Sequence, residues 1–472
     1  MRNNIILNSD SYKTSHWKIY PKGLQKMYSY FESRDGAKWN TTVFFGLQYF
    51  VKEYLEGVVV TEEKIKNAKK VIDAHMGPGI FNEEGWKYIL KEHGGKLPIR
   101  IKAVPEGSVI PVSNVMMTIE NTDEKCGWLT NYLETLLSNV WSPCTVATNS
   151  REQKKIILKY LEETGDPAEI DFKLHNFGAR GVSSPETAAT TDAAHLTAFK
   201  GSDAMIGIEL IQGYYNMEDM PSFSIPASEH SNCTLLGRKG EVDVMRKMLT
   251  EFPTGLMACV SDSFDIVQAC RDYWGGELKD LVLGRDGVLV VRPDSGDPTK
   301  VLPEILGILG SKFGQTKNSK GYYVLNNKVR VIQGDAVGIE TLPLYLEAIK
   351  EAGYSASNIA FGSGGGLVQK VDRDVQRFAV KCSAAKIDGE WRDVFKDPIT
   401  AGEFAKKSKA GRLALIPDGD SVKTIKVEGE TDHPEDLLVE VFLDGELTKE
   451  WTFDEVRKLA NKEFEAKVLQ PA

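Results

Sequence analysis

Long apolar runs are missing from this sequence. No stretch approaches the ~20 residues that a membrane-spanning helix needs, and the opening MRNNIILNSDSYK is too weakly apolar for a signal peptide. Cysteine is also scarce, and none of the six cysteines has CxxC spacing. Because a chain of this length needs no disulfides to fold, we expect reduced thiols and a cytoplasmic protein.

An excess of positive charge is absent too. Lys and Arg total 58 against 67 Asp and Glu, a formal net charge of −9. This balance argues against a dedicated nucleic-acid binder but leaves room for a local basic pocket that holds one phosphorylated metabolite. With 472 residues, 42% of them hydrophobic, the chain can form about two to four structural units and a core large enough for an enzyme.

No Pro/Ser-rich linker divides the chain, so changes in residue pattern must indicate the domains. Residues 1–165 mix strand-like and helical stretches and predict an α+β domain. The expected elements are a strand at 27–34, helices near 43–56 and 62–76, short strands within 99–120, and a helix over 128–163 broken near Ser142-Pro143. Residues 386–472 are expected to pack back on this domain.

Between residues 166 and 385, continuous apolar runs alternate with amphipathic helices, which predicts a parallel α/β sheet. The helices are recognised by apolar residues at i, i+3, i+4 and i+7. This spacing occurs at Ile266, Ala269, Cys270 and Tyr273, at Leu302, Ile305, Leu306 and Leu309, and at Leu342, Tyr345, Leu346 and Ile349. Both a (β/α) barrel and a doubly wound sheet fit the pattern.

Polar or glycine-rich residues follow each predicted strand. They occupy 175–180, 261–263, 292–296, 334–335 and 362–366. In either fold the carboxyl ends of parallel strands meet at one edge, where ligands bind. We therefore expect one shared site at this edge, although any single strand must end in turn residues anyway.

The glycine run Gly362-Ser363-Gly364-Gly365-Gly366 predicts a phosphate cradle, because successive backbone N–H groups can point into one concavity. A helix is expected next, over 367–377, and its N-terminus would add positive potential. The run matches neither a Walker loop nor GxGxxG.

Basic side chains at or after the strand ends suit a polyphosphate substrate, since Arg forks pair with phosphate oxygens, although a surface salt bridge is the commoner role for any one of them. They are Arg180, Arg292, Arg330, Arg373, Lys381, Lys396, Lys406 and Arg412. Carboxylates at the same edge suit Mg²⁺ carried by substrate phosphates. They are Asp203, Asp262, Asp294 and Asp335. A glycoside hydrolase, with two carboxylates as acid and nucleophile, is an alternative, and helix capping is an equal alternative for Asp262 and Asp335.

His230 follows Glu229 in the sequence Ser-Glu-His-Ser. A histidine beside a carboxylate serves as a general base, as a nucleophile or, more often, as a structural residue. The other six histidines show no metal-ligand spacing, so no zinc site is predicted.

Motifs along essentially the whole chain resemble the nicotinamide phosphoribosyltransferase family of type II phosphoribosyltransferases. They are Ser9–Lys13 with His16, Tyr28–Glu32, Phe45–Tyr49, Ala147–Glu152, Phe177-Gly178 with Arg180–Ser184, Glu229–Ser231, Val260–Ser263, Arg292–Gly296, Val331–Asp335, Phe361–Gly366 and Phe395–Pro398. The resemblance implies a (β/α) barrel-like type II fold with an additional α+β domain. It also implies a homodimer that joins nicotinamide to 5-phosphoribosyl-1-pyrophosphate with Mg²⁺, driven by ATP; nicotinate is the alternative substrate.

The resemblance also assigns roles to residues. Phe177 and Tyr12 of the other subunit would sandwich the ring, Arg180 and Asp203 would contact its substituent, and Asp294 would hold the ribose. His230 would accept phosphate from ATP, with Arg292 and Asp294 at the reacting centre. Substrate contacts are also implied for Asp262, Gly334, Asp335, Gly365 and Gly366. Phosphate contacts are implied for Arg34, Arg330, Arg373 and Lys381, with Lys396, Lys406 and Arg412 reaching in from the other subunit. Two positions depart from the family pattern: Ala179 replaces an aromatic residue and Ala336 a glycine.

Overall fold

The computed structural model describes residues 4–396 and 408–468. The chain divides into two compact units. Unit 1 comprises Met1–Thr145, Gln212–Met217 and Asp372–Ala460, and unit 2 comprises Val146–Ile211, Glu218–Val371 and Asn461–Ala472. The chain passes from one unit to the other at five points, and three of these lie within helices: α6 (Trp141–Thr164), α8 (Met205–Tyr214) and α16 (Phe453–Val468).

Unit 1 is built on a seven-stranded antiparallel sheet in the order β15-β14-β1-β5-β3-β18-β19. In that order the strands are Glu390–Asp393, Ala379–Ile387, Leu24–Glu32, Val115–Asn121, Ile99–Ala103, Val439–Leu443 and Glu446–Leu447. Every residue of β5 is buried, as expected for a strand near the middle of a covered sheet.

Helices and two small sheets complete unit 1. The helices are α1 (Leu47–Tyr54), α2 (Glu62–Met76), α3 (Glu83–Glu92), α4 (Leu129–Tyr132) and α5 (Glu134–Ser138). The small sheets pair β2 (Thr41–Val43) with β4 (Val109–Pro111) and β16 (Arg412–Asp418) with β17 (Ser421–Val427). The predicted break near Ser142-Pro143 is confirmed: α5 ends at Ser138 and α6 begins at Trp141, so Pro143 lies in the first turn of α6, where its missing N–H costs no helical bond.

Unit 2 contains a six-stranded parallel sheet in the order β7-β6-β13-β12-β9-β8. In that order the strands are Gly201–Ser202, Leu174–Asn176, Ile359–Ser363, Val329–Gln333, Asp286–Arg292 and Thr254–Val260. Residues 223–227 form bridges to both edge strands, through Phe223 to Gly201 and through Ala227 to Ala258. The sheet is therefore curled, with its two edges joined by one segment, which is the predicted barrel-like α/β fold.

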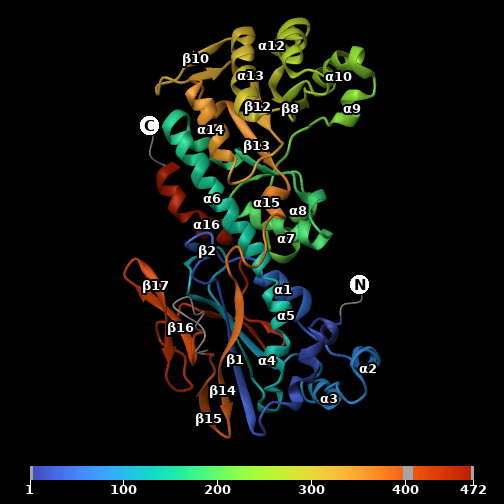
Figure 1. The fold of residues 1–472 in the computed structure, drawn as a ribbon, viewed down its shortest axis with the longest axis vertical. Coiled ribbons are helices and arrows are strands. Elements are labelled where there is room, and N and C mark those ends of the chain that lie inside the picture. Colours follow the sequence, from blue (N-terminus) through green and yellow to red (C-terminus); the bar gives the residue numbers. More distant parts are fainter. Residues whose placement is uncertain (1–3, 397–407, 469–472) are drawn as a thin grey trace. The chain divides into compact units, whose positions relative to one another are not determined.

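Helices follow the strands of unit 2, and in Figure 1 α13 and α14 lie beside β12 and β13. The helices are α7 (Pro185–Leu196), α9 (His230–Thr234), α10 (Gly237–Glu251), α11 (Ile266–Gln268), α12 (Lys279–Gly284), α13 (Pro298–Phe313), α14 (Leu342–Glu351) and α15 (Gly365–Val368). A small hairpin pairs β10 (Gln315–Lys317) with β11 (Tyr323–Leu325). All four predicted apolar positions of α13, and all four of α14, are buried.

The predicted stripe at Ile266, Ala269, Cys270 and Tyr273 is fully buried only at its two middle positions, Ala269 and Cys270. Residues Ala269–Glu277 form a π-helix, whose wider turn carries one residue more than an α-helical turn. Trp274 is therefore fully buried and donates from Nε1 to Ser261 Oγ at 3.0 Å, while Tyr273 stays half-buried. In the part of the chain that the structure describes, no helix combines the length and apolarity that a membrane crossing requires.

Candidate active site

The predicted polar strand ends lie at one edge of the unit 2 sheet. Strands β6, β13, β12, β9 and β8 are parallel neighbours, so their carboxyl ends face the same way. These ends bring together Phe177, Asp262, Arg292 and the two glycine-containing loops at 334–335 and 364–366. In a barrel-like sheet this edge is where reactive groups converge.

Phe177 lies directly after β6, and its ring occupies space left by a glycine. A Cβ on Gly362 would lie 1.9 Å from Cε2 of Phe177, so no other residue fits there without moving the ring. The backbone N–H of Phe177 donates to Ser363 O at 2.9 Å, and the Arg292 guanidinium lies 5.8 Å from the ring centroid. The ring is thus fixed at one edge and retains a half-buried face for a flat ligand.

Arg292 and Asp294 form a bidentate ion pair at the end of β9. Nε donates to Oδ1 at 2.9 Å and Nη2 to Oδ2 at 2.5 Å. A Cβ on Gly334 would lie 2.9 Å from Asp294 Oδ1, so this glycine lets the loop after β12 approach the pair closely. Burial works against the Arg292 charge, but hydrogen bonding to Asp294, with the fields of Asp262 and Asp203, raises its pKa above the usual value.

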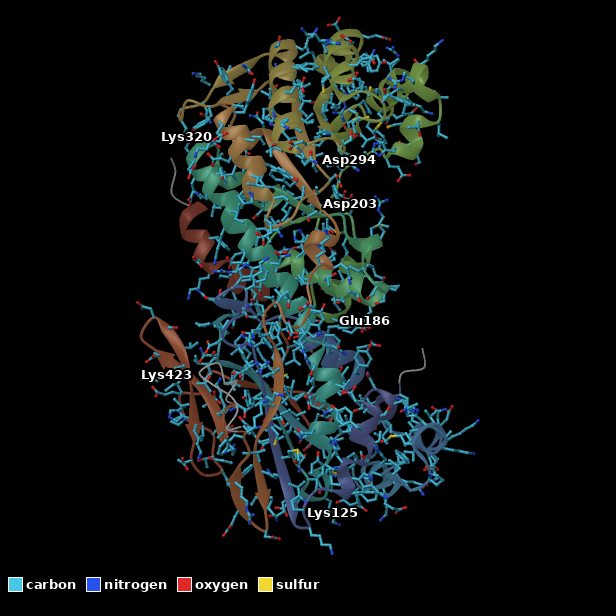
Figure 2. The ribbon with its side chains drawn as sticks, in the orientation of Figure 1. Lys125, Glu186, Asp203, Asp294, Lys320 and Lys423 are labelled. Carbon is cyan, nitrogen blue, oxygen red and sulfur yellow. The ribbon has the colours of Figure 1, made fainter. Side chains whose placement is uncertain are left out.

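Asp203 follows β7 at the same edge and is exposed. Ser224 donates its hydroxyl to Oδ1 of Asp203, and the backbone N–H of Asp203 donates to Asn176 O at 3.1 Å. Figure 2 shows Asp203 and Asp294 on the same side of unit 2. A carboxylate beside an aromatic ring offers a hydrogen-bond acceptor to a ring substituent that carries N–H groups.

His230 is the first residue of α9, and its Nε2 lies 3.1 Å from Oδ1 of Asp262. The imidazole is half exposed, whereas the Asp262 side chain is only 2% exposed. The Asp262 carboxylate therefore orients the ring and leaves Nδ1 as the nitrogen that can react. The predicted helix cap at Asp262 is not formed: α11 is capped by Asp265.

The glycine run forms a tight loop after β13. A Cβ on Gly366 would lie 2.8 Å from Val337 O, so the run packs closely on the loop after β12. Ala336, in that loop, has φ of +55°, a left-handed conformation that glycine adopts more readily. The predicted helix over 367–377 is wrong beyond Val368: α15 has four residues, and Lys370 N already bonds back to Gly365 O.

A cavity of about 490 Å³ runs from this edge into the barrel. Phe177, Asp203 and Arg292 line one part of it. Arg330 also lines it but belongs to the amino-terminal half of β12, and its Nη1 donates to the carbonyls of Leu325, Asn326 and Val329. The structure thus does not bring Arg330 to the edge with the other predicted residues. Arg180 lies at the edge, in a 3₁₀ turn after Phe177, and is exposed, as is Asp335.

Several predicted phosphate-binding cations belong to unit 1 and lie within electrostatic reach of one another. Burial lowers the pKa of Lys381, and the positive charges of Arg34, Lys396 and Arg373 lower it further, while Glu134 opposes them. Arg34 donates from Nε to Arg377 O at 3.0 Å. Cations gathered at this density are typical of an anion-binding surface.

The remaining predicted residues of unit 1 have separate surroundings. Arg412 is buried, and its Nη2 donates to Asp432 Oδ1 at 3.2 Å, so the structure does not add it to the cations around Lys381. Tyr12 is 58% exposed, and its ring centroid lies 5.2 Å from that of His16. Lys406 lies outside the described residues.

Sequence reasoning missed two polar residues behind the site, Ser224 and Asp192. Ser224 holds Asp203, and Asp192 accepts hydrogen bonds from Asn176 and Ser202. A usable signal existed for Asp192, because it is the lone carboxylate within the Ala/Thr-rich stretch TAATTDAAHLTA. Nothing in the local sequence marks Ser224.

One group of possible metal ligands was also missed, in unit 1. The ligand atoms of His93, Asp123 and Cys126 lie within 4.8 Å of one another. Asp123 Oδ2 already accepts from Tyr88 OH at 2.9 Å and pairs with His93 Nε2 at 2.8 Å. Burial raises the pKa of Cys126 to about 12. Because Asp123 already has these partners and also accepts from Lys125 N–H at 2.8 Å, the contacts favour a hydrogen-bonded cap over a metal centre.

Two models of known protein families match this chain, and together they cover most of it. The model described as the nicotinate phosphoribosyltransferase (NAPRTase) family matches residues 172–446, and the nicotinamide phosphoribosyltransferase N-terminal domain model matches residues 4–101. The chain is 48% identical over 467 residues to a protein from Xanthomonas campestris pv. campestris (strain 8004) named nicotinamide phosphoribosyltransferase, covering 97% of this chain and 98% of that one.

Two further proteins are similar over nearly their full lengths. A protein of the same name from Acinetobacter baylyi (strain ATCC 33305 / BD413 / ADP1) is 31% identical over 494 residues, covering 97% of each chain. Among solved structures, a nicotinate-nucleotide pyrophosphorylase from Pyrococcus furiosus superimposes with a TM-score of 0.64 at 16% identity, covering 100% of this chain and 98% of that one. At that identity the likeness concerns the fold alone.

Proposed function

The chain belongs to the nicotinate phosphoribosyltransferase family, and we propose that it transfers the 5-phosphoribosyl group of 5-phosphoribosyl-1-pyrophosphate to nicotinamide. The products are nicotinamide mononucleotide and pyrophosphate, a step of NAD salvage. The observation that carries the choice of nicotinamide is the Asp203 carboxylate in the cavity that Phe177 lines. Family membership also counts against the glycoside hydrolase alternative.

The ring of nicotinamide is proposed to stack on Phe177, with its amide N–H groups directed at Asp203. An amide donates two hydrogen bonds, whereas the carboxylate of nicotinate donates none and is repelled by Asp203. Ser224 holds Oδ1 of Asp203 and leaves lone pairs of the carboxylate available. These contacts support nicotinamide over nicotinate, the alternative substrate.

A homodimer is proposed to complete the ring site, with Tyr12 of one subunit stacking on the ring held by Phe177 of the other. Its support is the exposure of Tyr12, a large aromatic residue that does not fill the core of unit 1. Aromatic pairs on both faces of a flat substrate add directional contact beyond the area they bury.

The glycine run at 364–366 is proposed to bind a phosphate, because it offers backbone N–H groups and close approach. The cations around Lys381 are proposed as an anion-binding surface of unit 1, because they concentrate positive charge there. Mg²⁺ would arrive as part of the substrate, bound to its pyrophosphate. Asp262 Oδ2 has no hydrogen-bond partner among the described residues, which leaves a hard oxygen ligand at this edge for that ion.

Transfer of the phosphoribosyl group then depends more on positioning the two substrates than on acid–base catalysis. The bond from the ribose anomeric carbon to pyrophosphate breaks, the leaving group takes the electron pair, and the lone pair of the ring nitrogen forms the new C–N bond. Asp294, fixed by Arg292, would hold the ribose hydroxyls, and the backbone N–H groups of the glycine run would stabilise the departing charge. Because a pyridine nitrogen is already a nucleophile, no general base is required.

We also propose that His230 accepts the γ-phosphoryl group of ATP, which drives synthesis forward. With Nε2 oriented by Asp262, the Nδ1 lone pair would attack phosphorus, and ADP would leave with the electrons of the broken bond. A cytoplasmic location stays a prediction from the cysteine pattern.

The test of the proposed function is a steady-state assay with Mg²⁺, 5-phosphoribosyl-1-pyrophosphate and nicotinamide. The protein should release pyrophosphate and form the mononucleotide in equal amounts. Pyrophosphate release without mononucleotide, or binding of both substrates without turnover, would contradict the proposal.

A further inference from the structure

Asp192 is a buried carboxylate that contacts two strands of the barrel at once. It lies on α7, and its side chain has no exposed surface. Its Oδ1 accepts from Asn176 Nδ2 at 2.7 Å and from Ser202 Oγ at 2.5 Å. Asn176 and Ser202 are paired residues of the neighbouring strands β6 and β7, so one oxygen joins the ends of both strands.

The Asn176 side chain passes this restraint on to the turn that carries Phe177. Its Oδ1 accepts from the backbone N–H of Gly178 at 2.8 Å, which fixes the backbone on the far side of Phe177. Because Nδ2 is held by Asp192 at the same time, the amide cannot rotate. The direction of the Phe177 ring therefore depends on the Asp192 carboxylate, which accepts the hydrogen bond of Asn176.

The Ser202 side chain restrains the turn that carries Asp203 in the same way. Its Oγ donates to Asp192 and accepts from the backbone N–H of Ala204 at 3.0 Å. The N–H of Asp203 itself donates to Asn176 O at 3.1 Å. The backbone is thus held on both sides of Asp203 by residues whose side chains bond to Asp192.

The surroundings of Asp192 indicate that packing alone does not explain a carboxylate at this position. Burying a carboxylate costs free energy unless its oxygens are bonded, and Oδ2 has no partner among the described residues. A Cβ on Gly207 of α8 would lie 2.0 Å from Oδ2, so the neighbouring helix leaves room for that oxygen. A well-packed apolar residue would commonly be at least as stable at such a position.

We propose that Asp192 is a positioning residue that sets the separation of Phe177 and Asp203 and thereby the affinity for the ring substrate. The inference rests on the proposed function, in which these two residues bind the ring and its amide. It predicts a specific kinetic effect, because the groups that bind the phosphates are held by other contacts.

The experiment compares Asp192→Ala, Asp192→Asn and the matched control Thr191→Val. Thr191 is a buried neighbour on α7 whose hydroxyl bonds only within its own helix. Asp192→Ala should raise KM for nicotinamide about 5- to 150-fold, the effect of two lost hydrogen bonds, and leave KM for 5-phosphoribosyl-1-pyrophosphate within about twofold. Asp192→Asn should restore most of the loss, since its amide oxygen can accept both bonds. Thr191→Val should change neither KM.

Equal rises in both KM values, a fall in kcat alone, or no rescue by Asp192→Asn would overturn the inference. If Asp192→Ala does not fold, Ser202→Ala, which removes one of the two donors, takes its place with an expected rise of about 2- to 12-fold in KM for nicotinamide only. A wild type that turns over no nicotinamide would defeat the proposed function. A wild type that does, with unchanged KM in these variants, would defeat the role of Asp192 alone.

Discussion

Gly362 of β13 borders the ring of Phe177, which follows β6, so closely that a Cβ on the glycine would lie 1.9 Å from Cε2 of the ring. The two strands are hydrogen-bonded neighbours, and Gly362 pairs with His175. A strand interior is an unfavourable place for glycine unless something approaches closely. Here the approaching group is the aromatic ring proposed to bind the substrate.

Gly362→Ala should therefore displace Phe177 and weaken stacking. An aromatic pair contributes about 0.5–1.5 kcal/mol beyond area burial, so kcat/KM for nicotinamide should fall about 2- to 12-fold. Gly284→Ala is the matched control, because a Cβ there meets nothing within 4 Å. Equal kcat/KM values for the two variants would contradict the close packing of the Phe177 ring on Gly362.

Asp203→Asn should weaken the use of nicotinamide and narrow its advantage over nicotinate. A hydrogen bond to a charged group is worth about 1.5–3 kcal/mol, which corresponds to a loss of roughly 10- to 150-fold in kcat/KM. The control is Asp243→Asn, an exposed carboxylate of α10. The measurement is kcat/KM for both substrates; an unchanged ratio in Asp203→Asn would remove Asp203 from substrate selection.

His230→Ala should lose stimulation by ATP and keep slow basal synthesis, because the imidazole is proposed to carry the phosphoryl group without contacting the ring. Rates with and without ATP test this, together with transfer of labelled γ-phosphate to the protein. His433→Ala, a residue of unit 1, serves as the control and should keep the label. Labelling that persists in His230→Ala would assign the phosphoryl group elsewhere.

The buried Asp192 carboxyl should also make the free energy of unfolding depend on pH. Burial, the first cause, and the nearby charge of Asp203 raise its pKa to about 7, against the opposing hydrogen bonds of Ser202 and Asn176. As pH rises from about 4 to 7, the unfolded chain releases a proton that the folded protein keeps, so the free energy of unfolding falls over that window. Below about pH 4 and above about pH 7 the contribution is flat.

Asp192→Asn lacks this titration. Its free energy of unfolding, minus that of the wild type, should therefore increase by roughly 2–3 kcal/mol between pH 5 and pH 8. Urea unfolding of both proteins at the two pH values measures the difference. A difference that is the same at both would show that Asp192 does not titrate in this range.

Much of unit 2 could be predicted from local sequence. The apolar stripe of α13 at Leu302, Ile305, Leu306 and Leu309 depends only on helical spacing, and all four residues are buried. The shared edge could also be predicted, because parallel strands all end on the same side. The stripe ending at Tyr273 failed because a π-helix changes the spacing and buries Trp274 in its place.

The residues behind the site could not be predicted in the same way. Asp192 meets Asn176 across 16 positions and Ser224 meets Asp203 across 21, so their pairing depends on how separate strands and helices pack. The cations around Lys381 come from well-separated parts of the chain, from Arg34 to Lys396. The residue pattern named Arg373, Lys381 and Lys396 as basic side chains after the strand ends, whereas Arg34 was implied only by the family resemblance.

Asp203 is the residue through which this family member is proposed to select nicotinamide. The most direct test is a competition in which the wild-type protein receives equal concentrations of nicotinamide and nicotinate with Mg²⁺ and limiting 5-phosphoribosyl-1-pyrophosphate, and the two mononucleotides are quantified by mass spectrometry. We expect nicotinamide mononucleotide in excess by at least about tenfold, the lower value for one charge-assisted hydrogen bond. Equal amounts, or an excess of nicotinate mononucleotide, would contradict the assignment.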